Sequence, residues 1–440
     1  MLYLVNKSMQ NIDSLKHFYD IQNDYIGKKA QKGMKANKMG FLADFYFNVI
    51  AHGSDEEKTH PTFLNLQKTI EEHIDIVSIT NKGVKYSIKS NAPDLFVNIK
   101  KSAKEYKKYQ DMPITHGNNT LIMLITKFEE FISDFITYIY EKYPHKYLDN
   151  KEITFAEIED NGIDNVKDFI ITREIDHIMR ESYEVWFKLF EDHKISLKAC
   201  CKEYETLKEL YARRNIIVHN SGKVNDIYLK NIPNSNFKVG EKLYADEIYI
   251  HTAFETIKTI IFCILIEAIK LDKENKKDYI ENLFNYSFDE LASENYHTAE
   301  TVFNCIYNCN FSDEITKQMS RVNYWIAKIE NDGLQSVKEE IENFDTSALD
   351  KSFFMAKLIL LKNYSSATTC IEDLCDKGEL DNTAIEEWPL FKEYRKTDEY
   401  IKFKESHPEL FGVLTSETEP NDPLGDLQVT QNVKAELKNT

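Results

Sequence analysis

Apolar residues recur at helical spacing over long stretches of this chain, and the pattern is strongest near its middle. The run LIMLITKFEEFISDFITYIYEKY has apolar residues every three or four positions, which is typical of a helix with one buried face. Four helices are predicted here, from about Leu121 to Tyr143, Val166 to Phe190, Leu197 to His219 and Asp246 to Leu271. Helices of this length predict an antiparallel bundle over residues 111–272.

The region before this bundle, residues 1–110, contains one apolar and one alternating segment. The apolar segment, Phe41 to Ile50, predicts a buried helix, and the alternation from Ile76 to Ile99 predicts a small β-hairpin. Two lysine clusters also stand out, and they comprise Lys28, Lys29, Lys32, Lys35 and Lys38, then Lys100, Lys101, Lys104, Lys107 and Lys108. Such clusters are usually solvated helix faces. Because Tyr106 and Tyr109 lie within the second cluster, a surface that follows nucleic-acid phosphates is the alternative.

The region after the bundle, residues 273–412, is also predicted to be helical, and it carries a faint repeat. Tyr324-Trp325-Ile326-Ala327, followed by Leu334, Val337 and Ile341, matches Phe354-Met355-Ala356, followed by Tyr364, Ala367 and Ile371. The offset is about 30 residues. This pattern resembles tetratricopeptide-like repeats, in which small alanines let paired helices approach and whose usual period is ~34. Residues 413–440 are polar without an apolar period, and this predicts a flexible tail.

Composition favours a soluble helical protein of two or three domains, because 440 residues exceed one ordinary core and 13 Gly with 9 Pro are few for a turn-rich β fold. The N-terminus lacks the pattern of a signal peptide, and the longest apolar run is too short to span a membrane. Seven scattered cysteines without CxxC spacing predict reduced thiols in the cytoplasm. A net charge of −18 repels phosphate, so any contact with RNA requires a local basic patch.

The most informative segment is LKELYARRNIIVHNSGKVNDIYL, which runs from Leu207 to Leu229. On a helical wheel the predicted core stripe contains Leu207, Leu210, Tyr211 and Val218. Arg214 falls in the same stripe, where a charge is costly unless it is paired or faces water. Asn215 and His219 are four residues apart and lie on one flank of the stripe. The helix is predicted to end at Asn220-Ser221-Gly222, which would place these side chains at the mouth of the bundle.

These three residue types suit the cleavage of RNA. Histidine transfers protons near neutral pH, and the planar guanidinium of arginine matches phosphate oxygens. The ribose 2′-hydroxyl of the substrate is the nearest nucleophile, so this chemistry needs neither a metal nor another cofactor. One histidine cannot easily act on both sides of phosphorus, and two copies that meet across a two-fold axis would solve this problem.

Arg214-Asn215-Ile216-Ile217-Val218-His219 resembles the R-x4–6-H motif of HEPN domains, in its RNxxxH form. The resemblance extends to Gly222, to Tyr228-Leu229 and to the helix after Lys242-Leu243, and it covers the predicted bundle only. It implies a metal-independent endoribonuclease that acts as a homodimer and cuts tRNA, rRNA or mRNA, as in toxin and anti-phage systems. By this resemblance His219 is the catalytic acid or base, Arg214 binds phosphate and Asn215 assists.

Further contacts with RNA are predicted for Arg213, Lys223, Lys100, Lys101, Lys104, Lys107 and Lys108. Arg213 precedes the motif by one residue and would face elsewhere, so its role is predicted to be auxiliary. The C-terminal region would bind a protein trigger or inhibitor. Another HEPN subgroup, which pairs with a nucleotidyltransferase, carries a tyrosine two residues after the histidine. Ser221 occupies that position here and argues against this subgroup.

Two alternatives stay open. His219 and the arginines also suit a helix C-terminus that they simply cap. A non-catalytic HEPN scaffold whose helical repeats bind a protein partner is favoured by the net charge of −18. No Walker loop, GxGxxG, GxSxG or HExxH motif is present, so the sequence does not support an ATPase, a dinucleotide-binding enzyme, an α/β-hydrolase or a zinc protease.

Overall fold

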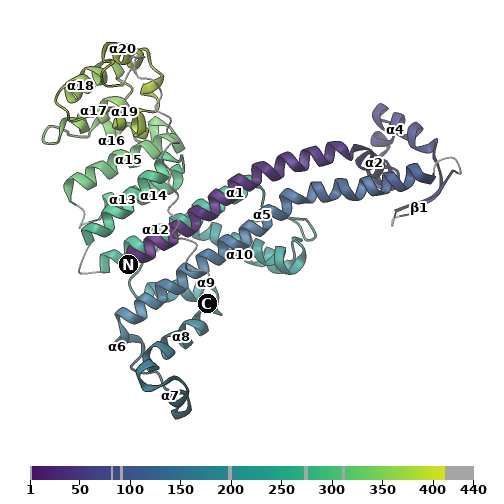
Figure 1. The fold of residues 1–440 in the computed structure, drawn as a ribbon, viewed down its shortest axis with the longest axis horizontal. Helices are drawn as coiled ribbons and strands as arrows, with labels where there is room; N and C mark the ends of the chain where they lie inside the picture. The colour runs from purple at the N-terminus through teal and green to yellow at the C-terminus, as the bar shows by residue number, and fades with distance from the viewer. Residues whose placement is uncertain are drawn as a thin grey trace, which may run out of the picture. The chain divides into compact units, whose positions relative to one another are not determined.

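The computed structural model describes residues 2–80, 83–89, 93–196, 201–271, 276–309 and 313–411, which form an all-α fold with one small hairpin (Figure 1). The fold class predicted from apolar periodicity is therefore confirmed. The chain divides into two compact units, Met1–Asn331 and Asp332–Thr440. No described helix is long and apolar enough to cross a membrane. The tail predicted at 413–440 and the helix start predicted at Leu197 lie outside the described residues.

Two long helices organise the first unit. α1 (Leu2–Ala36) and α5 (Pro93–Lys142) run side by side in opposite directions (Figure 1). A Cβ at Gly33 would lie 2.3 Å from the ring of Tyr109, so only glycine permits this close approach. Residue 110, where the N-terminal region was expected to end, lies inside α5. The predicted N-terminal region and the predicted bundle therefore share one helix.

The chain between α1 and α5 forms a small cluster of elements with its own core. It consists of α2 (Lys38–His52), α3 (Asp55–Thr59), α4 (Pro61–Glu71), β1 (Ile74–Thr80) and β2 (Gly83–Ile88). The strands are antiparallel, with Ile74 opposite Ile88. The buried side chains are Ala43, Tyr46, Val49, Phe63, Ile70 and Ile74. The predicted helix and hairpin are confirmed, except that residues 95–99 belong to α5. A short apolar run does not distinguish a strand from a helix.

The second half of α5 packs against the other helices of the predicted bundle. These are α8 (Val166–Met179), α9 (Tyr183–Asp192), α10 (Cys201–Asn220) and α12 (Glu247–Leu271). Three short helices lie between α5 and α8 along the described chain, namely α6 (Pro144–Tyr147), α7 (Phe155–Asn161) and η1 (Ile163–Asn165). The single helix predicted from 166 to 190 is wrong, because the helix breaks before Ser182. This serine is extended, with φ −78° and ψ 160°, as is usual at a helix N-cap. The Trp186 indole closes the break by donating a hydrogen bond to the Ile178 carbonyl at 2.7 Å.

Helices continue to the end of the described chain, as predicted. The first unit ends with α13 (Lys276–Ala292), α14 (Tyr296–Tyr307) and α15 (Glu314–Asp332), and the second contains α16 (Lys338–Glu342), α17 (Lys351–Leu360), α18 (Tyr364–Asp376), α19 (Asn382–Glu387) and α20 (Asp398–Ser406). Several positions of the predicted repeat are buried, namely Ala327, Val337, Ile341, Ala356, Ala367 and Ile371. The repeat itself stays a prediction, because the boundary after Asn331 divides its first half between the two units.

Gly117 of α5 lies where the backbone of another segment approaches the helix closely. A Cβ there would lie 1.9 Å from the carbonyl oxygen of Ala245. We expect Gly117→Ala to lower the free energy of unfolding, measured in urea, by about 1–3 kcal/mol through overpacking. Gly27→Ala is the matched control, because nothing lies within 4 Å of its Cβ. It should be neutral or stabilise the protein by about 0.4–1 kcal/mol. Equal stability of the two variants would contradict the close approach.

Candidate functional site

α10 ends at Asn220, where the sequence predicted a helix stop. Ser221 and Gly222 adopt left-handed conformations, with φ 53° and 76°. The Gly222 N–H donates to the Ile216 carbonyl at 2.9 Å and thereby closes the helix. The chain then turns back, and Lys223 forms an isolated β-bridge with Lys242. The last turns of α10, which carry the candidate residues, therefore have a defined exit.

The core stripe predicted on α10 is correct at three of its four positions. Leu207, Leu210 and Tyr211 are buried, but the prediction for Val218 is wrong because this residue is 48% exposed. The last turns instead bury another face in a small cluster that contains Ala212, Ile216, Val224, Tyr228 and Leu243. This cluster exists because the segment after α10 folds back over the helix. The apolar period of α10 alone cannot report such a contact.

Arg214 is half-buried and paired, as a charge in an apolar stripe requires. Its guanidinium donates to the Glu129 carboxylate of α5 at 2.9 Å and to the amide oxygen of Asn215 at 3.2 Å. It also lies 5.7 Å from the centroid of the Tyr211 ring. A partly exposed ion pair of this kind contributes about 1 kcal/mol or less. A phosphate group can therefore compete with Glu129 for the guanidinium.

Arg214 and Asn215 line a cavity of about 760 Å³. Its other lining residues come from α5, from the break between α8 and α9, from α10 and from α11 (Asp226–Asn231). The cations among them are Arg180, Lys208, Arg214 and Lys230, and the carboxylates are Glu129, Glu181 and Glu184. Sequence reasoning missed Arg180 and Lys230, because only the break at Ser182 and the folding back of α11 bring them to α10.

His219 does not line this cavity. It lies five positions after Arg214, so the two side chains leave α10 about 140° apart, whereas the side chains of Asn215 and His219 are separated by about 40°. The imidazole is exposed, and no described residue forms a hydrogen bond or ion pair with it. One chain therefore brings Arg214 together with Asn215, but His219 faces solvent on a different side of the helix.

Arg213 lies in a partly buried polar network. Its guanidinium pairs with Glu209 at 2.8 Å, donates to the Tyr244 carbonyl at 2.8 Å and stacks over the Tyr249 ring at 3.9 Å. Glu209 also accepts hydrogen bonds from the hydroxyls of Tyr228 and Tyr249, at 2.7 and 2.5 Å. These contacts use the donors of Arg213 within the fold. Its predicted contact with RNA therefore has no support from the geometry.

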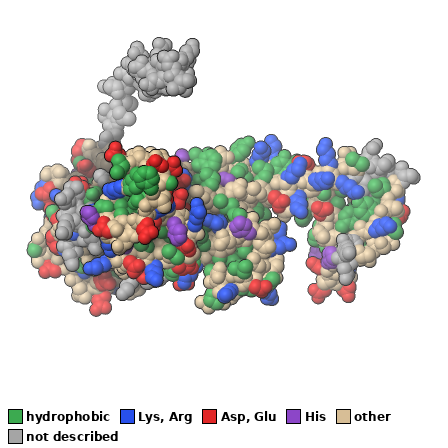
Figure 2. Space-filling model, turned by 90° about the horizontal axis from the view of Figure 1, so that it is seen from below, with side chains coloured by type: hydrophobic (Ala, Val, Ile, Leu, Met, Phe, Trp, Pro, Cys, Tyr) green, Lys and Arg blue, Asp and Glu red, His purple; other side chains and the backbone are tan. Residues whose placement is uncertain are grey.

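The predicted RNA-binding lysines on α5 are exposed, as is Lys223 near the end of α10. Lys108 pairs with Glu105 at 2.6 Å, and Lys100 lies 5.7 Å from the centroid of the Tyr86 ring. Lysine and arginine side chains lie along the arm that α1 and α5 form, among apolar, uncharged and some acidic ones (Figure 2). Lys108 precedes Glu129 by 21 positions on α5, which is about 30 Å of helix. The lysine cluster is therefore remote from the cavity that Arg214 lines.

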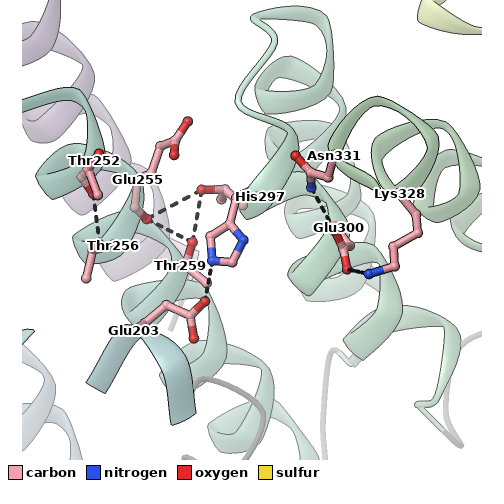
Figure 3. Close-up of polar contacts among 10 residues, drawn as sticks. Glu203, Thr252, Glu255, Thr256, Thr259, His297, Glu300, Lys328 and Asn331 are labelled. Atoms are coloured by element: carbon pink, nitrogen blue, oxygen red, sulfur yellow. Dashed lines mark hydrogen bonds and ion pairs between the residues drawn. The ribbon is translucent and has the colours of Figure 1, made fainter. Parts of the chain in front are cut away.

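A second polar cluster links α10, α12 and α14 (Figure 3). The buried Glu203 carboxylate of α10 hydrogen-bonds to the His297 ring of α14 at 2.5 Å, and the Thr259 hydroxyl of α12 hydrogen-bonds to the Thr298 hydroxyl of α14 at 2.9 Å. The hydrogen bond to Glu203 raises the pKa of His297, partial burial opposes this shift, and the charges of Glu203, Glu255 and Glu300 add to it. Burial raises the pKa of the Glu255 carboxyl. The cluster therefore joins α14 to α10 through His297, which is charged more readily than usual, and to α12 through Thr298.

We expect the two adjacent arginines to contribute different amounts to the stability of the fold. We expect Arg213→Ala to lower the free energy of unfolding by about 1–3 kcal/mol, because it leaves the largely buried carboxylate of Glu209 without its cation. Arg214→Ala should lower it by less than about 1 kcal/mol, because its ion pair is partly exposed. Urea denaturation of both variants measures the difference. A loss for Arg214→Ala as large as that for Arg213→Ala would mean that Arg214 serves the fold.

The raised pKa of His297 predicts that the stability of the fold depends on pH. Its pKa in the folded chain is above the usual value of about 6.5. Protonated His297 therefore contributes stability that is complete below pH 6.5 and is lost as the pH rises through the raised pKa. Urea denaturation at a series of pH values should show this decline in the wild type and a flatter profile in Glu203→Gln. His145→Gln, which removes an exposed partner of Asp149, should keep the wild-type profile. Identical profiles for all three proteins would contradict the assignment.

Comparison with known proteins does not identify a family for this chain. No protein-family model matches the chain, and no curated protein or solved structure is significantly similar to it. The resemblance to HEPN domains therefore depends on the residues around Arg214 and His219. An activity for this site is accordingly a proposal.

Proposed function

We propose that the chain is a metal-independent endoribonuclease that acts as a homodimer, with Arg214, Asn215 and His219 in its active site. The observation that carries the proposal is the cavity of about 760 Å³ beside α10. Four cations and three carboxylates line it, so its lining is positive overall although the chain has a net charge of −18. Arg180 and Lys230 have no ion-pair partner among the described residues. Positive charge gathered in a polar cavity suits the phosphate backbone of RNA.

The cleavage step follows from these residue types. A histidine base accepts the proton of the ribose 2′-hydroxyl, and the 2′-oxygen forms a bond to phosphorus. The guanidinium of Arg214, released from Glu129, stabilises the negative charge on the phosphate oxygens. The bond from phosphorus to the 5′-oxygen breaks, and a protonated histidine donates a proton to that oxygen. The products are a 2′,3′-cyclic phosphate and a 5′-hydroxyl.

A homodimer would supply the second histidine that one chain lacks. His219 leaves α10 on a different side from Arg214 and is exposed. A second copy that packs against the end of α10 would place its own His219 opposite the first. Two histidines then serve as base and acid on opposite sides of phosphorus, which one imidazole cannot do. The two-fold symmetry makes both contributions equal.

The lysines of the arm would hold RNA outside the active site. Gly33 faces α5, so Lys28, Lys32 and Lys35 leave α1 on its outer side. Tyr109 likewise faces α1. The side chains of Lys100, Lys104 and Lys107 therefore leave α5 on its outer side. Between residues 25 and 41 five lysines occur without an acidic residue. Such a local excess of positive charge binds phosphates without reading the sequence of the RNA. A role in phage defence or as a toxin is proposed from the HEPN resemblance alone.

The proposal is tested by RNA cleavage in EDTA. We expect wild-type protein to cut RNA and leave 2′,3′-cyclic phosphate ends. His219→Ala should lose at least 10²-fold in rate, as expected for loss of general acid–base catalysis. Arg214→Ala should lose activity although it lowers the free energy of unfolding by less than about 1 kcal/mol. Lys167→Met, at an exposed position on α8, is the matched control for loss of one positive charge and should cleave as the wild type does. Cleavage by His219→Ala at the wild-type rate would exclude the proposed active site.

The second candidate is a non-catalytic scaffold that binds a protein partner. It is favoured by the pairing of Arg214 with Glu129 and by the distance of His219 from the cavity. Expression in a host cell separates the two candidates. A toxic ribonuclease should be tolerated far better as His219→Ala than as wild type, whereas a scaffold should show no difference.

A further inference from the structure

A second cavity, of about 330 Å³, lies at the C-terminal end of α5. Its volume is that of a pocket for a small organic molecule. The apolar part of its wall includes Phe135, Ile139, Ile195 and Ala268, together with the tyrosines that lie around the end of α5. None of these residues lines the cavity beside Arg214. The site is therefore separate from the proposed ribonuclease site, and nothing assigned so far uses it.

Two polar side chains in the wall of this cavity lack hydrogen-bond partners. Both ring nitrogens of His193 and the hydroxyl of Tyr147 are buried without a partner among the described residues. His193 is only 8% exposed, and its ring stacks on that of Tyr147 with centroids 4.5 Å apart. The backbone of Leu189 approaches the ring without a well-formed hydrogen bond. A buried polar atom without a partner costs about 1–3 kcal/mol, so this arrangement needs an explanation.

The charged side chains in the described wall of this cavity are positive. Lys142 and Lys146 line it, and no carboxylate does so among the described residues. Lys142 donates to the Tyr138 hydroxyl at 2.8 Å, and Lys146 lies 5.2 Å from the centroid of the Tyr147 ring. Burial, together with the charge of Lys146, lowers the pKa of His193 to about 4, so this ring is neutral at pH 7. It then offers one donor and one acceptor.

We infer that this cavity binds a small aromatic anion, with its rings among the apolar side chains and its negative charge beside Lys142 and Lys146. Aromatic walls favour a flat apolar body, and two lysines in an acidic chain favour an anion. The nitrogens of His193 and the hydroxyl of Tyr147 have almost no contact with solvent. A hydrogen-bonding edge of the ligand reaches them only if this stacked pair shifts towards the cavity. Binding would then satisfy the polar atoms that the fold leaves without partners.

Two fluorescent probes that share the same rings test the inference on the full chain. The anion is 1-anilinonaphthalene-8-sulfonate, and the uncharged analogue is N-phenyl-1-naphthylamine. We expect the wild type to bind one sulfonate per chain, at least about tenfold tighter than the amine. Ala268→Phe, which fills the cavity, should weaken the binding of both probes by at least about tenfold. The double variant Lys142→Met and Lys146→Met should weaken only the sulfonate.

The matched control is the double variant Lys167→Met and Lys188→Met, which removes two exposed charges from α8 and α9 outside the cavity. It should bind both probes as the wild type does. Circular dichroism shows whether Ala268→Phe is folded, and the lysine variant decides the result if it is not. Equal affinity of the wild type for both probes would overturn the inference of an anion site. Unchanged sulfonate binding by the variant that lacks Lys142 and Lys146 would overturn it as well.

Discussion

Burial of one face of α5 is the constraint on which the first unit depends. The buried residues recur every three or four positions: Leu121, Leu124, Phe128, Ile132, Phe135 and Ile139. This stripe packs against the bundle helices, whereas α2 packs against the earlier part of the same helix and α1 runs along both parts. The same helix also supplies Glu129 to the cavity beside Arg214, and Phe135 and Lys142 to the cavity near His193. Both candidate sites therefore use a helix that is held rigidly by its core face.

Two neighbouring arginines illustrate how the same charge serves different purposes. Arg213 and Arg214 leave α10 about 100° apart. Arg213 enters a network with Glu209 and two tyrosine hydroxyls, in which every contact stabilises the fold. Arg214 has one partly exposed carboxylate partner and lies at the edge of a polar cavity. A charge that the fold holds weakly is the one available for a ligand, and this difference makes Arg214 the stronger candidate for phosphate binding.

Much of the helical architecture could be predicted because it depends on interactions within a few residues. The apolar period placed α12 to within a residue of its ends, and Asn220-Ser221-Gly222 correctly predicted where α10 stops. The alternation after Ile76 correctly predicted the hairpin. Prediction failed where a distant segment decides the result. Ser182 breaks the helix expected over 166–190, and the segment after α10 buries Ile216 and leaves Val218 exposed.

The sequence alone determined the all-α class, the position of most helices and the presence of Arg214, Asn215 and His219 near one helix end. The tertiary structure alone decided which side chains share a cavity. It added Arg180 and Lys230 to the surroundings of Arg214, left His219 outside and put His193 beside Tyr147. The physical reason is the range of the interactions. Helix periodicity and capping act over a few neighbouring residues, whereas a cavity forms from the packing of segments that are far apart in the chain.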